Sequence, residues 1–162
     1  AFWNSKFIES HIMSKEPMKW VNEIVKNVDR IYIHLNINEN VLDVLKFIKK
    51  SGCETGIVIH EKDDIKYINM YHDIIDSVLV LSIKNPGYSG QKFRPETIDI
   101  INLINSNKFR NKISLNVDGG INQGNVNLID SENVVSGSYV LNSKNPKEKI
   151  MVLQTSSQYE SI

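Results

Sequence analysis

The feature that most constrains the fold is a regular alternation of β-like and helical segments. Runs rich in β-branched and aromatic residues predict strands, and each is followed by a segment with apolar residues at helical spacing. The strands are expected at residues 6–13, 28–35, 55–60, 77–83, 112–117 and 133–137. This alternation predicts parallel strands joined by right-handed crossovers, in either an open doubly wound sheet or a (β/α)8 barrel. By count alone, these units favour the doubly wound sheet.

Several residues mark helix starts and a buried strand. Pro95 stands at a predicted helix start, and Asn38 or Asn40 can cap the helix whose apolar stripe runs through residues 41–48. Further helices are expected at 63–72, 122–130 and 146–154. The strand at 77–83 is continuously apolar, which predicts that both of its faces are buried in a parallel sheet.

The composition restricts the cellular compartment and the classes of binding partner that we expect for the chain. The chain of 162 residues is predicted to be one domain, and its 19 Lys and Arg residues balance its 19 Asp and Glu residues. A neutral chain has no bulk electrostatic attraction for nucleic acid or an anionic membrane, so we expect neither as a partner. The single cysteine, Cys53, cannot form an internal disulfide, and no apolar run approaches the ~20 residues of a membrane span. We therefore expect a cytoplasmic protein.

Clusters of small residues follow the last three predicted strands. They are NPGYSGQ at 85–91, DGG at 118–120 and SGS at 136–138. One such cluster alone is more often a plain turn. Three of them at the carboxyl ends of successive strands lie on one face, and glycine lets backbone N–H groups approach an anion closely. Together they predict a phosphate site, which recurs after the late strands of (β/α)8 barrels.

Two titratable residues, Asp118 and His11, lie at the same face of the predicted sheet, formed by the carboxyl ends of its strands. Asp118 lies at a strand end beside two glycines, where it is either a turn cap or a metal ligand and general base. His11 also lies near a strand end, and a His and an Asp converging from different strands are suitable donors for a metal ion. His34 occupies a similar place, although a lone His is more often structural. His60 and His72 are expected on the surface.

Four ordered segments carry a resemblance to a known family. ESHIM followed by EPMKW, then NPGYSGQKFRPE, LNVDGGIN and VVSGSYVL resemble, in order and spacing, the signature segments of ribulose-phosphate 3-epimerase. That family has a (β/α)8 barrel and interconverts ribulose 5-phosphate and xylulose 5-phosphate. The resemblance implies that residues 1–162 form a single domain of about three quarters of such a barrel, beginning at its third strand. It replaces the doubly wound sheet as the expected fold.

The resemblance also implies roles for particular residues. In the family a divalent ion (Zn, Fe or Mn) holds the ketose oxygens, and two aspartates on opposite faces of the sugar exchange the C3 proton. Asp118 matches the aspartate that is both metal ligand and acid or base. His11 matches a metal-ligand histidine at the substrate. The matched phosphate-binding positions are Gly87, Tyr88, Ser89, Gly90, Gly119, Gly120, Gly137 and Ser138.

Part of the family's site has no match in this sequence. The second aspartate, a second metal histidine and a substrate-contacting serine belong to the family's first two strands. We therefore expect that the residues present in this chain do not hold a metal ion tightly and do not invert C3 of the sugar without a further group. Leu81 and Lys84 depart from the family pattern beside the phosphate turn, so a six-carbon ketose phosphate such as allulose 6-phosphate is an alternative substrate.

Two further expectations follow from the same resemblance. A non-catalytic phosphate-binding paralogue is the alternative function of another class. An incomplete barrel also leaves strand edges without partners, which favours self-association into a homo-oligomer.

Overall fold

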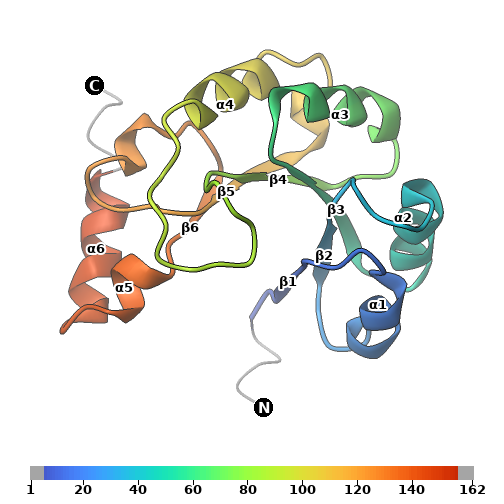
Figure 1. Cartoon of the computed structure of the whole chain (residues 1–162), viewed down its shortest axis with the longest axis horizontal. Coiled ribbons are helices and arrows are strands. Elements are labelled where there is room, and N and C mark those ends of the chain that lie inside the picture. The colour runs from blue at the N-terminus through green and yellow to red at the C-terminus, as the bar shows by residue number, and fades with distance from the viewer. Residues whose placement is uncertain (1–5, 157–162) are drawn as a thin grey trace.

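The protein, seen here as a computed structural model that describes residues 6–156, is a curled parallel sheet with helices along one side (Figure 1). All six predicted strands are confirmed, and they pair in chain order. The strands are β1 (Glu9–Ile12), β2 (Arg30–Ile33), β3 (Glu54–Ile59), β4 (Ser77–Leu81), β5 (Ser114–Asp118) and β6 (Asn133–Val135). The helices are α1 (Met18–Ile24), α2 (Val41–Lys50), α3 (Lys66–Tyr71), α4 (Thr97–Asn105), α5 (Ser138–Leu141) and α6 (Pro146–Ser156). Short 3-10 turns are η2 (Lys62–Ile65), η3 (Arg110–Lys112) and η4 (Val126–Leu128).

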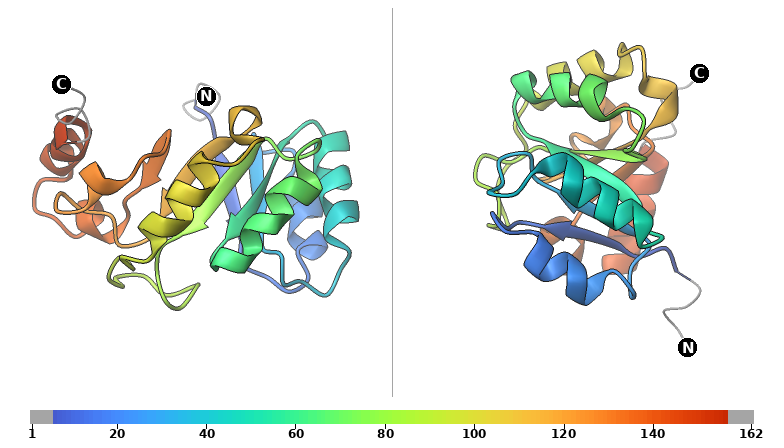
Figure 2. Two further views of the ribbon diagram at one scale, coloured as in Figure 1. Left: turned by 90° about the horizontal axis from the view of Figure 1, so that it is seen from above. Right: turned by 90° about the vertical axis from the view of Figure 1, so that its right-hand side faces the viewer.

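The strand order decides between the two architectures. In a doubly wound sheet the order reverses beside the first strand, whereas in a barrel each strand pairs with the next one along the chain. Here the order is sequential, and Figures 1 and 2 show the sheet curling into an arc with α1 to α4 along its convex side. Within residues 6–156, β1 and β6 are the two edges and do not pair with each other. The fold is a (β/α)8-type barrel of which six strands are present.

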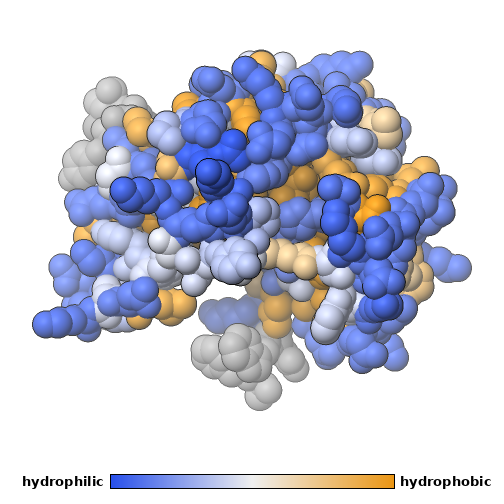
Figure 3. Space-filling model, viewed as in Figure 1, coloured by the Kyte–Doolittle hydropathy of each residue, from blue (hydrophilic) through white to orange (hydrophobic). Residues whose placement is uncertain are grey.

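The core lies on both sides of the sheet, because alternate residues of a strand face opposite sides. On the convex side, Leu45 of α2 and Ile101 of α4 belong to one large buried cluster with strand residues such as Ile57. The concave side holds a smaller cluster formed by Tyr32, Val58, Leu79, Leu81 and Ile83. Every residue of β4 is buried, as its apolar run predicts. Most of the face seen in Figure 3 is hydrophilic, with smaller hydrophobic areas between the polar side chains.

A polar cluster occupies the concave side near the amino-terminal ends of the strands. Asn116 Nδ2 donates hydrogen bonds to Tyr32 Oη at 2.8 Å and to Ser77 Oγ at 2.7 Å, and Tyr32 Oη donates to Glu9 Oε1 at 2.9 Å. The Tyr32 ring lies directly over Gly56 of β3, where an added Cβ would stand 2.2 Å from the ring. The cluster therefore links the five neighbouring strands β1 to β5 around one aromatic side chain.

The helix predicted at residues 122–130 is wrong, because only η4 forms there. The side chains of Asn122 and Asn125 bond to the local backbone instead. Asn122 N donates to Asn125 Oδ1 at 2.9 Å, and Asn125 Nδ2 donates to Gly120 O at 3.0 Å. Such local bonds compete with helix formation. Of the two predicted caps of α2, Asn38 and Asn40, the structure has Asn40, whose Oδ1 accepts from Asp43 N at 3.2 Å. None of the helices described between residues 6 and 156 is long and apolar enough to cross a membrane.

Candidate active site

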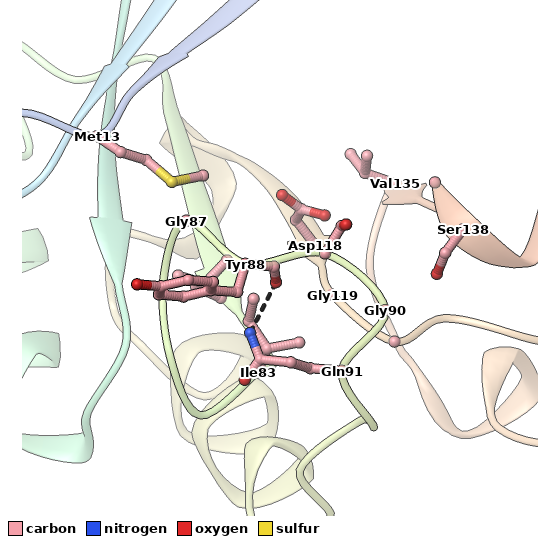
Figure 4. A pocket seen from close by; sticks show the side chains of 14 residues that line it. Met13, Ile83, Gly87, Tyr88, Gly90, Gln91, Asp118, Gly119, Val135 and Ser138 are labelled. Carbon is pink, nitrogen blue, oxygen red and sulfur yellow. Dashed lines mark hydrogen bonds between the residues drawn. The ribbon is translucent and has the colours of Figure 1, made fainter. Parts of the chain in front are cut away.

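The three small-residue clusters of the sequence meet in one pocket of about 280 Å³ at the carboxyl ends of β4, β5 and β6. Their convergence follows from the register, because Leu81 pairs with Asp118, and Asp118 pairs with Val135. Figure 4 shows Asp118 between Met13 and Tyr88 on one side and Val135 and Ser138 on the other. The pocket lining includes every predicted phosphate-binding position: Gly87, Tyr88, Ser89, Gly90, Gly119, Gly120, Gly137 and Ser138.

The loop after β4 forms the first wall of the pocket. Gly87 and Gly90 have φ angles of 91° and 75°, in the left-handed region that favours glycine. The side chain of Gln91 braces the loop from within: its Nε2 donates to Tyr88 O at 2.7 Å and to Asn85 O at 2.6 Å, and its Oε1 accepts from Asn85 N at 3.0 Å. The loop therefore has a defined shape in which the glycines make the turns and Gln91 holds them.

The turn after β5 forms the second wall. Gly119 and Gly120 both have positive φ, 119° and 68°. A Cβ on Gly119 would lie 2.6 Å from Ile83 Cγ2, and a Cβ on Gly120 would lie 2.3 Å from Phe93 N. Glycine is thus required twice over, by backbone conformation and by the close approach of the preceding loop.

Backbone N–H groups are available in this pocket. Within residues 6–156, the N–H groups of Gly119, Gly120 and Gly137 donate no hydrogen bond. Unpaired backbone donors that converge on a pocket are suited to the oxygens of a phosphate group. Arg94, a nearby cation, is engaged elsewhere: it pairs with Glu61 at 3.1 Å and Glu96 at 3.0 Å. The geometry therefore favours anion binding by the backbone.

Asp118 is the only carboxylate among the described residues that line the pocket. It takes part in none of the ion pairs formed within residues 6–156. Burial raises the pKa of its carboxyl group, because the charged form loses solvation. A raised pKa makes the ionised carboxylate a stronger base, which suits a group that takes a proton from carbon.

The predicted ligand His11 lies outside this pocket and faces another histidine. His11 Nε2 and His34 Nε2 are 2.9 Å apart, and the two rings stack with centroids 5.0 Å apart. His11 Nδ1 is buried and has no hydrogen-bond partner within residues 6–156. Burial, and then the nearby charge of His34, lower the pKa of His11 to about 4. Both imidazoles are thus held in their neutral forms at pH 7, because burial also lowers the pKa of His34.

The described residues do not complete a metal centre. Within residues 6–156, no group of three or more His, Cys, Asp or Glu side chains is arranged to hold an ion. One ring nitrogen of His11 is already paired with His34. Binding of Zn, Fe or Mn by His11 and Asp118 stays a prediction.

Two histidines expected on the surface are partly enclosed instead. His60 lines a second pocket of about 460 Å³ together with His34, and its Nε2 contacts Ile83 O at 2.7 Å. His72 stacks on Phe109 with centroids 3.7 Å apart. No periodic pattern in the sequence predicts either contact, because each partner, Ile83 or Phe109, lies in a loop of another part of the chain.

The comparisons with known proteins agree with this geometry. Residues 3–141 match the model of the ribulose-phosphate 3-epimerase family. The chain belongs to this family. It is 32% identical over 158 residues to the ribulose-phosphate 3-epimerase of Chlamydia muridarum, covering 91% of this chain and 69% of that protein. It is 31% identical over 149 residues to the Escherichia coli K12 protein of the same name, covering 80% of this chain and 65% of that protein. The family consists of isomerases that act on sugar phosphates.

Solved structures confirm the barrel fold. The 3-hexulose-6-phosphate synthase of Salmonella typhimurium superposes with a TM-score of 0.71 at 15% identity, over 97% of this chain and 75% of that one. The phosphoribosyl anthranilate isomerase of Thermotoga maritima gives a TM-score of 0.62 at 18% identity, over 94% and 73%. At these identities the likeness concerns the fold alone.

Proposed function

We propose that this chain binds D-ribulose 5-phosphate and exchanges the proton at C3, as one half of the reaction that yields D-xylulose 5-phosphate. The observation that carries the proposal is the single pocket in which Asp118 and three glycine clusters meet. The N–H groups of Gly119, Gly120 and Gly137 would hold the phosphate oxygens. The sugar chain would then extend from the phosphate towards the Asp118 carboxylate.

The proton transfer is assigned to Asp118. Its ionised carboxylate removes the C3 proton, and the electron pair left behind delocalises onto the C2 carbonyl as an ene-diolate. Return of the proton by Asp118 to the same face restores ribulose 5-phosphate. Inversion at C3 requires a donor on the opposite face, and the described lining of the pocket contains no second carboxylate. Complete epimerisation therefore needs a second acid or base from outside the described lining of this pocket.

A divalent ion is not used in this assignment. The family resemblance implies one, but His11 and Asp118 are only part of a ligand set, and the described residues do not assemble the remainder. The choice between a pentose and a six-carbon ketose phosphate also stays open, although Leu81, one of the residues that departs from the family pattern, does line the pocket.

The test is exchange of the C3 proton of ribulose 5-phosphate in deuterium oxide, followed by proton NMR. The wild-type chain should exchange this proton, and Asp118→Asn should slow exchange by at least ~100-fold, because a general base contributes about that much. Asp99→Asn, at an exposed position on α4, is the matched control and should exchange at the wild-type rate. Equal rates for Asp118→Asn and wild type would remove Asp118 from the mechanism.

One observation supports a second candidate, a phosphate-binding protein without catalysis. Asp118 is the one carboxylate lining the described pocket, whereas epimerisation uses an acid and a base on opposite faces. Binding of ribulose 5-phosphate with no deuterium incorporation at C3, in the presence or absence of added divalent ions, would favour this candidate.

A further inference from the structure

Ser82, the residue after β4, is bonded to both walls of the pocket although it does not line it. Its side chain is completely buried. Its N–H donates to Asp118 O at 2.8 Å, and its hydroxyl donates to Gly119 O at 2.6 Å, with Asp118 O also 2.9 Å from Oγ. Its own carbonyl accepts from Arg94 N at 2.8 Å. A single residue therefore holds the turn after β5 and closes the loop after β4.

These hydrogen bonds set the direction of the backbone N–H groups of the turn after β5. In a trans peptide the C=O and the following N–H point in opposite directions. Because Asp118 O and Gly119 O are turned towards Ser82, the N–H groups of Gly119 and Gly120 are turned away from it. Neither of those two N–H groups donates a hydrogen bond within residues 6–156. The orientation of the anion-binding donors thus depends on acceptors that Ser82 occupies.

The two walls also pack against each other around this residue. A Cβ on Gly119 would meet Ile83, which follows Ser82, and a Cβ on Gly120 would meet Phe93, which precedes Arg94. The turn after β5 therefore fits between the two ends of the loop that Ser82 closes. A shift of the turn would move the N–H groups and the Asp118 carboxylate together.

We propose that Ser82 is a positioning residue, which sets the direction of the Gly119 and Gly120 N–H groups for the phosphate of the substrate. The proposal rests on the phosphate site of the proposed function. Since a hydrogen bond of this kind contributes about a factor of ten to an equilibrium, its loss should weaken phosphate binding by about tenfold.

The experiment is a titration of the 15N-labelled chain with inorganic phosphate and with ribulose 5-phosphate, followed by amide NMR. In the wild type, the Gly119, Gly120 and Gly137 resonances should shift on binding. In Ser82→Ala, the dissociation constant should rise about tenfold, with smaller shifts at Gly119 and Gly120 than at Gly137. Should Ser82→Ala fail to fold, Ser82→Cys, which keeps the shape but donates weakly, takes its place with the same expected direction.

Ser77→Ala is the matched control. Ser77 is also a fully buried serine, and it lies at the start of β4, whereas Ser82 follows the end of this strand. Ser77 Oγ donates to Ser114 O of β5 at 2.8 Å and accepts from Asn116 Nδ2 at 2.7 Å, so its loss removes buried hydrogen bonds between strands away from the pocket. Ser77→Ala should lower the melting temperature but leave the dissociation constant within about twofold of wild type. A Ser82→Ala constant that is also within twofold would overturn the role of Ser82 and leave the phosphate site intact. Absence of any amide shift in the wild type would overturn both.

Discussion

At the scale of single residues, Asp118 is placed for reaction at a cost in stability. Burial raises the pKa of its carboxyl group, so the folded chain retains the proton to a higher pH than the unfolded chain does. Between the ordinary pKa of an aspartate, about 4, and the raised value, folding is therefore coupled to proton uptake. The contribution of Asp118 to stability falls as the pH rises through this range.

Because ionisation of buried Asp118 destabilises the folded chain, removing the ionisable group should stabilise it at neutral pH. Asp118→Asn, which cannot ionise, should melt at a higher temperature than wild type at pH 7, and the difference should vanish near pH 3, where both side chains are neutral. Circular dichroism melts at the two pH values, with a chelator present, measure it. Asp99→Asn should show no such gain. An Asp118→Asn variant that is less stable than wild type at pH 7 would contradict the argument.

A second residue-scale prediction separates backbone from side-chain recognition of the phosphate. Gly137 lines the pocket, has a negative φ (φ −85°, ψ −83°), and has no atom within 4 Å of an added Cβ. The Val side chain of Gly137→Val should therefore meet no protein atom closely, yet it would enter the space of the phosphate. We expect the dissociation constant for ribulose 5-phosphate to rise by about tenfold or more, because a ligand held at a distance loses its hydrogen bonds.

Lys92→Ala is the comparison for Gly137→Val. Lys92 is exposed and is absent from the lining of the pocket that contains Asp118. Its truncation should change the dissociation constant by less than about threefold, since an exposed charge is screened by salt. Calorimetric titration measures both variants. Greater damage from Lys92→Ala than from Gly137→Val would show that a cationic side chain, not the backbone, holds the phosphate.

At the scale of strands, the buried tyrosine of β2 crosses its neighbour β3 at a glycine. An added Cβ at Gly56 would lie 2.2 Å from the Tyr32 ring, so Gly56→Ala should displace the ring and break the hydrogen bonds of the Tyr32 hydroxyl with Asn116 and Glu9. We predict a loss of about 1–3 kcal/mol in the free energy of unfolding, as for other overpacked cores. Urea unfolding measures it.

A second substitution tests the cause. In a Tyr32→Ala background the ring is gone, and Gly56→Ala should then cost little beyond the loss already caused by Tyr32→Ala. The same cost in both backgrounds would mean that the strand backbone, rather than the ring contact, requires glycine at this position.

The elements also show what a sequence can and cannot predict. The apolar run of β4 predicted a strand buried on both faces, and DGG after β5 predicted a functional turn, because both signals are local. The roles of Ser82 and Gly56 depend on atoms of other strands and leave no periodic pattern. The wrong helix at 122–130 has a local cause, since Asn122 and Asn125 bond to the backbone in a way that helical spacing does not show.

At the scale of the whole molecule, the fold is an arc rather than a ring within residues 6–156. The outer edges of β1 and β6 have no partner strand there, and unpaired edges favour association. Self-association of the chain stays a prediction. On the concave side the chain places a polar cluster instead of a wholly apolar layer: Arg30 pairs with Glu9 at 2.6 Å and with Glu54 at 2.5 Å. The Arg30 guanidinium and the two carboxylates thus compensate one another's charge on the concave side of β1 to β3.

The open arc of residues 6–156 limits the chemistry that these residues can perform alone. Asp118 can serve one face of the sugar, and no second carboxylate of the described part of the chain lines its pocket. We therefore predict that the isolated chain exchanges the C3 proton of ribulose 5-phosphate but forms no xylulose 5-phosphate. Proton NMR in deuterium oxide, with and without added Zn²⁺, Fe²⁺ or Mn²⁺, measures both outcomes in one sample. Epimer formation would mean that another residue supplies the opposite face, and His34 and Glu61, which line the adjoining pocket, are the first to substitute.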